Sequence, residues 1–118
     1  MNSRMKESDI QKALVDWLNI IKPDCEYFSV PNEATFRNRG LRAMGVKPGV
    51  ADLVFWGMPE YPVAFVELKL KNNSQTRDQE IFEERCLARN IPYHLIATSD
   101  PEVAVDRVGS LLREWGAL

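Results

Sequence analysis

Two apolar runs separated by a short turn constrain the fold more than any other part of the sequence. ADLVFW at 51–56 and VAFVELKL at 63–70 are rich in β-branched and aromatic residues, and GMPEYP at 57–62 has the glycine and prolines of a turn. If this turn closes a hairpin, Asp52 at the start of the first strand lies near Glu67 and Lys69 at the end of the second. Burying such charges among Val, Phe and Leu costs several kcal/mol per ion unless the ions pair or bind a metal. The hairpin therefore predicts a cluster of charged side chains that either pair with one another or bind a metal.

Side-chain alternation sharpens this prediction. Successive side chains of a strand point to opposite faces, so Glu67, Lys69 and Lys71 share one face. The opposite face of the same strand is fully apolar, and we expect it to pack against a helix; it carries Ala64, Val66, Leu68 and Leu70.

The rest of the chain alternates helical and strand patterns. Apolar residues at helical spacing predict helices over about 6–22 and 77–89, and CEYFSV and PYHLIAT predict two more strands. Asp100 and Pro101 have the residue types of an N-cap and a first helical position, so they predict a closing helix. Between the first strand and the hairpin, residues 32–46 are polar and glycine-punctuated, with a short helix expected over 39–44. The order predicts an α/β fold, with a mixed central sheet of about four strands flanked by helices.

Length and composition limit the possible classes. With 118 residues the chain is expected to form one domain over 1–118. No apolar run approaches the roughly 20 residues of a membrane span, and the polar start predicts no signal peptide. Cys25 and Cys86 are too far apart in sequence to predict a metal-ligand pair or a disulfide framework. We therefore expect a cytoplasmic protein without a membrane partner.

Charge is unevenly distributed. The net charge is only −2, so global charge does not predict nucleic-acid binding. Residues 34–51, however, contain four basic and no acidic residues, namely Arg37, Arg39, Arg42 and Lys47. This segment is equally compatible with phosphate contact and with a solvated loop.

The converging charges have two readings. Two carboxylates beside an ammonium group suit a hard cation such as Mg²⁺, which takes few carboxylates together with waters and phosphate oxygens. The same residues also suit a cross-strand ion pair at a sheet edge. The residues alone leave both readings open.

A wider set of motifs resembles a known family. Asp52 followed by VELK at 66–69 is similar to the PD-(D/E)XK nuclease signature, and the whole pattern resembles the VRR-NUC family of virus-type replication-repair nucleases. The matching pieces, in family order, are Glu7 with Gln11, VPNEA at 30–34, GVKPGVADL at 45–53, VELK at 66–69 and SQTRDQEIF at 74–82. One departure is that Ala51 stands where the signature has proline.

The resemblance implies roles for particular residues. Asp52 and Glu67 would bind the metal, Glu7 would complete the metal environment, and Lys69 would assist the attacking water. Gln79 would lie beside the lysine, so that all five count as catalytic residues. Phosphates near the site would be held by Asn32, Arg37, Arg39, Lys47 and Lys71.

The resemblance also implies a function. It predicts a restriction-endonuclease-like fold and a Mg²⁺- or Mn²⁺-dependent DNA endonuclease, acting as a homodimer on branched, Holliday-junction-like DNA. Such a role belongs to DNA repair in a bacterial or phage-infected cell. Two alternatives remain: a catalytically silent DNA-binding or assembly subunit, and a restriction-type nuclease on linear duplex.

Other residues receive structural interpretations. Glu7 heads the apolar stripe of the first helix, unless Ser8 caps that helix together with Gln11 and leaves Glu7 outside. Trp17, Trp56 and Trp115 are expected in the core, and His94 in a structural role.

Overall fold

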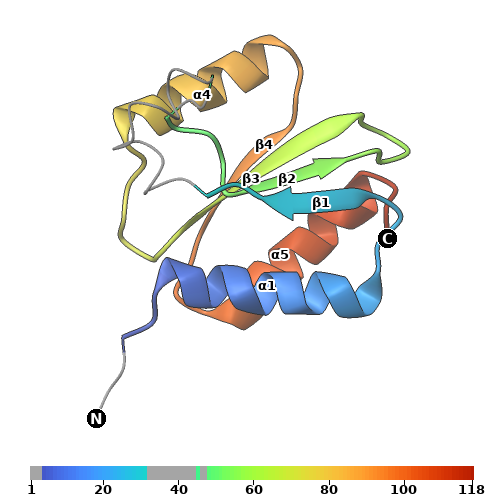
Figure 1. Cartoon of the computed structure of the whole chain (residues 1–118), viewed down its shortest axis with the longest axis horizontal. Coiled ribbons are helices and arrows are strands. Elements are labelled where there is room, and N and C mark those ends of the chain that lie inside the picture. Colours follow the sequence, from blue (N-terminus) through green and yellow to red (C-terminus); the bar gives the residue numbers. More distant parts are fainter. Residues whose placement is uncertain (1–3, 32–44, 46–47) are drawn as a thin grey trace.

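The computed structural model describes residues 4–31, 45 and 48–118. Figure 1 shows this part of the chain as a sheet between helical layers. The elements in chain order are α1 (Glu7–Ile21), β1 (Glu26–Ser29), β2 (Leu53–Trp56), β3 (Val63–Lys69), α4 (Arg77–Ala88), β4 (Tyr93–Ala97) and α5 (Pro101–Glu114). The predicted α/β fold is confirmed, and the predicted elements within the described residues differ from the observed ones by at most two residues at their ends. The short helix predicted over 39–44 lies outside the described residues.

The strands form one mixed sheet in the order β1-β2-β3-β4. β2 is antiparallel to both β1 and β3, whereas β3 and β4 are parallel and are joined by the crossover helix α4. The predicted hairpin is confirmed, since the Gly57 N–H donates to the Pro62 carbonyl at 3.0 Å. Leu53 pairs with Val66 in this hairpin. Extending this antiparallel register by one residue places Asp52, the residue just before β2, across from Glu67 in β3.

Helices α1 and α5 cover one face of the sheet (Figure 1). The core under them includes the apolar face predicted for β3, of which Ala64, Val66 and Leu68 are buried. α5 begins as the sequence predicts, because the Asp100 side chain accepts the Glu102 N–H at 2.9 Å and Pro101 follows it.

Helix α4 packs on the other face of the sheet through aromatic contacts. The rings of Phe65 and Phe82 meet edge to face with their centroids 4.9 Å apart, and the ring centroids of Phe82 and Tyr93 are 6.0 Å apart. Because Glu67 follows Phe65 by two residues on the same strand, this packing sets the start of α4 beside the predicted site.

The expectation that all three tryptophans lie in the core is only partly right. Trp115 is buried and Trp17 half-buried, but Trp56 is 47% exposed. Trp56 ends β2 next to the hairpin turn, on the α4 side of the sheet, and α4 packs mainly against β4 at the other edge. The His94 ring packs against the buried Trp115 ring with the two centroids 6.0 Å apart, which fits the structural role expected for His94.

In the part of the chain described above, no helix is long and apolar enough to cross a membrane.

Candidate active site

Glu67 is a buried carboxylate on β3, an inner strand of the sheet. Its side chain is 1% exposed. Oε2 accepts a hydrogen bond from the Gln79 amide at 3.0 Å, while Oε1 is buried and accepts none from the residues that the structure describes. Buried polar atoms are satisfied in the great majority of cases, so an exception needs an explanation.

Electrostatics make the charged form of Glu67 costly. Burial raises the pKa of Glu67 to about 9, and the charge of Asp52 acts in the same direction. Lys69 lowers this pKa and Glu7 raises it, both more weakly. A cation bound between the carboxylates would relieve this cost.

Asp52 is held at the edge of the hairpin by the backbone. Its Oδ2 accepts the Leu68 N–H at 2.7 Å, and its carbonyl accepts the Val30 N–H at 2.8 Å. These bonds fix Asp52 against the end of β3 and beside β1. The predicted convergence of Asp52 and Glu67 is therefore confirmed by position and by electrostatic coupling.

Glu7 is the first residue of α1. The Asp9 carboxylate accepts the Lys6 N–H at 2.9 Å and closes the first turn. The alternative, in which Ser8 caps the helix and leaves Glu7 outside, is thus wrong, because the N-cap residue is Lys6 and the helix already begins at Glu7. Glu7 and Asp52 line one groove of about 580 Å³ at the mouth of the site.

Lys69 ends β3 and is half-buried, two residues beyond Glu67 on the same face. Lys71 lies just beyond the strand, exposed, and its N–H donates to the Ser99 hydroxyl at 3.2 Å. The remaining predicted phosphate-binding residues fall outside the described part of the chain; they are Asn32, Arg37, Arg39 and Lys47.

Sequence reasoning missed two residues near the carboxylates. The Gln75 amide donates to the Tyr93 hydroxyl at 3.1 Å. Burial raises the pKa of Tyr93, and the charge of Glu67 raises it further. Tyr93 shares a sheet face with Phe65, across the parallel pair of strands. The available signal was the alternation of PYHLIAT, which points Tyr93 and His94 to opposite faces.

The donor set fits a divalent cation in part. Glu67 offers a buried oxygen to which no described residue donates a hydrogen bond, and the Asp52 carboxylate stands beside it. Carboxylate oxygens are the ligands that Mg²⁺ and Mn²⁺ prefer. Among the residues that the structure describes, no three His, Cys, Asp or Glu side chains are grouped so as to hold a metal ion together. Glu7 acts on Glu67 through its charge without joining such a group.

Comparison with known proteins adds a structural relative. No family model matches the sequence, and no curated protein matches it either. A solved structure named "VRR_NUC domain protein" superposes with a TM-score of 0.67 at 19% sequence identity, over 98% of this chain and 90% of that one. The chain thus has the fold of a VRR_NUC domain protein, as the motifs predicted.

Proposed function

We propose that this chain is a nuclease domain spanning residues 1–118 that uses Mg²⁺ or Mn²⁺ to hydrolyse phosphodiester bonds in DNA. The observation that carries the proposal is the pairing of the buried Glu67 with Asp52, in which one Glu67 oxygen receives no hydrogen bond from the described residues. The VRR_NUC fold, over nearly the whole chain, supports the same reaction class.

Each residue of the site would have its own role in the reaction. Asp52 and Glu67 would hold the cation, with Glu7 at the mouth of the groove adding negative charge. The bound cation would polarise the phosphoryl oxygen and lower the pKa of a water. Lys69 would orient that water, and its ammonium would stabilise the charge that develops on the phosphate. Gln79 would hold Glu67 in place through its amide.

The groove suggests how DNA approaches. Besides Glu7 and Asp52, it is lined by Arg4 and Lys6, both exposed at the start of the chain. Lys71 adds a third exposed cation beyond the end of β3. Such cations neutralise phosphates and give binding that weakens with salt. We propose branched DNA as the substrate and a homodimer as the active form, on the strength of the family resemblance.

A cleavage panel tests this function. The protein would be incubated with a labelled four-way junction, a flap and a linear duplex, each in Mn²⁺, Mg²⁺ or EDTA. We expect metal-dependent cutting with the junction preferred, and two protomers per junction in sedimentation. Cutting confined to linear duplex would favour a restriction-type nuclease, while junction binding without any cutting would favour a DNA-binding subunit.

Lys69 separates chemistry from metal binding. Lys69→Met is expected to lower kcat by about 10²–10⁴-fold, the usual contribution of a positioned proton-transfer group. Mn²⁺ affinity should stay within about threefold of wild type, because the carboxylates are unchanged. Lys71→Met serves as the matched control, since it removes an ammonium two residues further out and should affect KM and salt dependence instead. Equal kcat losses in the two variants would contradict the role given to Lys69.

A further inference from the structure

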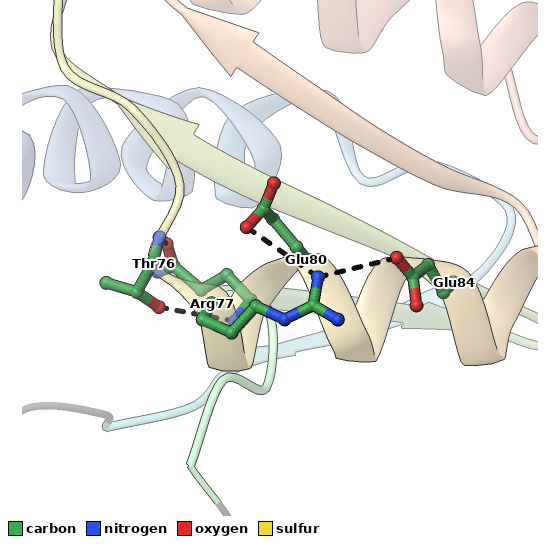
Figure 2. A network of polar contacts seen from close by, with 5 residues as sticks. Thr76, Arg77, Glu80 and Glu84 are labelled. Carbon is green, nitrogen blue, oxygen red and sulfur yellow. Dashed lines mark hydrogen bonds and ion pairs between the residues drawn. The ribbon is translucent and has the colours of Figure 1, made fainter.

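The first turn of α4 is closed by a reciprocal pair of hydrogen bonds. Thr76 is the N-cap residue, and its hydroxyl accepts the Gln79 N–H at 3.2 Å. In return, the Gln79 side-chain oxygen Oε1 accepts the Thr76 backbone N–H at 2.8 Å. Figure 2 shows Thr76 at this helix start, next to Arg77, which reaches Glu80 and Glu84 along the helix. The arrangement is a capping box.

This box fixes the direction in which the Gln79 amide points. The Thr76 N–H can only donate, so the amide must turn its oxygen toward Thr76 and its NH₂ group away. The NH₂ group then meets Glu67 Oε2 at 3.0 Å. A flipped amide would set two donors against each other at Thr76 and two acceptors against each other at Glu67. Both ends of the amide therefore favour one orientation.

The box has a consequence for the carboxylate. Glu67 has two oxygens; the Gln79 amide occupies Oε2, and Oε1 accepts no hydrogen bond from the described residues. We infer that Thr76 is a positioning residue: its backbone N–H orients Gln79, which ties down one oxygen of Glu67 and presents the other to the divalent cation. This inference rests on the proposed function.

Helix capping alone does not account for glutamine at this position. A glutamate at the third helical position closes the same box and also suits the helix dipole. A glutamate at residue 79, however, would have no N–H for Glu67 and would add a third carboxylate beside Glu67 and Asp52. The amide satisfies both the helix end and the buried carboxylate.

Two substitutions at Thr76 isolate its N–H. Thr76→Ala removes the hydroxyl and keeps the N–H. Thr76→Pro removes both, and the Thr76 φ of −75° already suits proline. Its carbonyl, which accepts the Glu80 N–H at 3.0 Å, is retained in both variants. Asp100→Ala controls for the general loss of an N-cap, because it removes the matching cap of α5.

Binding of Mn²⁺ alone, followed by electron paramagnetic resonance, gives the first measurement, with kcat and KM for DNA cleavage alongside. Thr76→Pro should weaken Mn²⁺ affinity about 10–100-fold, the usual effect of losing a group that orients a metal ligand. Thr76→Ala and Asp100→Ala should stay within about threefold of wild type. If Thr76→Pro binds Mn²⁺ as tightly as Thr76→Ala, the inference is overturned while the proposed function stands. A wild-type protein that neither binds Mn²⁺ nor cleaves DNA would overturn both.

A second measurement needs no variant. The Thr76 N–H precedes the helix, so without the Gln79 oxygen it would have no acceptor among the described residues and would exchange with solvent quickly. We expect its hydrogen exchange in the metal-free wild-type protein to be slowed at least tenfold relative to an unprotected amide. We also expect the two Gln79 side-chain amide protons to be well resolved by NMR. An unprotected Thr76 amide would overturn the inference even if Thr76→Pro failed to fold.

Discussion

Replacing Glu67 with glutamine is expected to abolish metal-dependent cleavage and, at the same time, to stabilise the metal-free protein at pH 8. Glutamine keeps the shape of the side chain but gives a divalent cation no anionic oxygen. Removing a cation ligand should lower cleavage by at least about 10³-fold, comparable to the loss of other groups that stabilise transition-state charge. Loss of activity combined with gain of stability is the signature of a carboxylate kept for function.

The stability gain follows from the raised pKa of Glu67. The unfolded chain loses this proton near the ordinary pKa of 4.5, whereas the folded protein keeps it up to about 9. Between these values the folded state binds more protons than the unfolded state, so the free energy of unfolding falls as the pH rises. A glutamine has no proton to lose, so Glu67→Gln should remove this part of the pH dependence. At pH 8 we expect a gain of about 1–3 kcal/mol, the usual cost of a buried, unsatisfied polar group.

Thermal melts in EDTA between pH 5 and pH 9 would measure this effect. Wild type should lose stability relative to Glu67→Gln across that range, and the curves should meet near its acid end. Added Mn²⁺ should raise the melting temperature of wild type and leave that of Glu67→Gln unchanged. Glu60→Gln, on the exposed hairpin turn, is the matched control and should follow wild type throughout. A Glu67→Gln protein that still cleaves DNA would refute the metal-ligand role.

The hairpin accounts for most of what the sequence could predict about the site. The turn at 57–62 and the alternation of VELK place Asp52 across from Glu67 through local rules, and the observed register agrees. Local rules also gave the N-cap at Asp100. These features depend on neighbours in sequence or on a single strand pair, so pattern reasoning reaches them.

Contacts that depend on how α4 packs were not predictable in the same way. The Gln79 bond to Glu67 and the Gln75 bond to Tyr93 join the segment around the start of α4 to two parallel strands. Their partners are set by the aromatic packing under α4, which no local pattern encodes. The start of α1 was left open for another reason: Ser8 is a good N-cap residue, and sequence alone could not show that the helix begins earlier, at Glu7, with Lys6 as its N-cap residue.

The same packing makes Gly49 the glycine at which adding a methyl group should destabilise the protein most. Gly49 has a φ of +82°, and a Cβ placed on it would lie 2.5 Å from the Asp78 carbonyl carbon and 2.9 Å from the Asp78 Cβ. The carbonyl carbon belongs to the backbone and the Cβ is bonded directly to it, so no flexible side chain can move aside. The loop leading to Asp52 thus touches the first turn of α4 directly, and only glycine permits the approach.

Gly49→Ala is therefore expected to destabilise the protein by about 2–5 kcal/mol, from the left-handed backbone together with overpacking. Gly57→Ala separates the two causes, because Gly57 has a similar φ of +77° but no atom within 4 Å of the added Cβ. It should cost only about 1–2 kcal/mol. Urea unfolding of both variants gives the comparison, and equal losses would mean that the contact with Asp78 does not matter.

The Gly49→Ala substitution should also weaken metal binding at the site. Asp52 follows three residues later, and Gln79 is next to Asp78, so separating loop from helix pulls the Asp52 and Gln79 partners of Glu67 apart. At a temperature where both variants are fully folded, Gly49→Ala should bind Mn²⁺ more weakly than Gly57→Ala. If instead the two bind Mn²⁺ equally while Gly49→Ala is the less stable, the close approach serves the fold alone. The carboxylate pair would then owe its geometry to the hairpin, without help from α4.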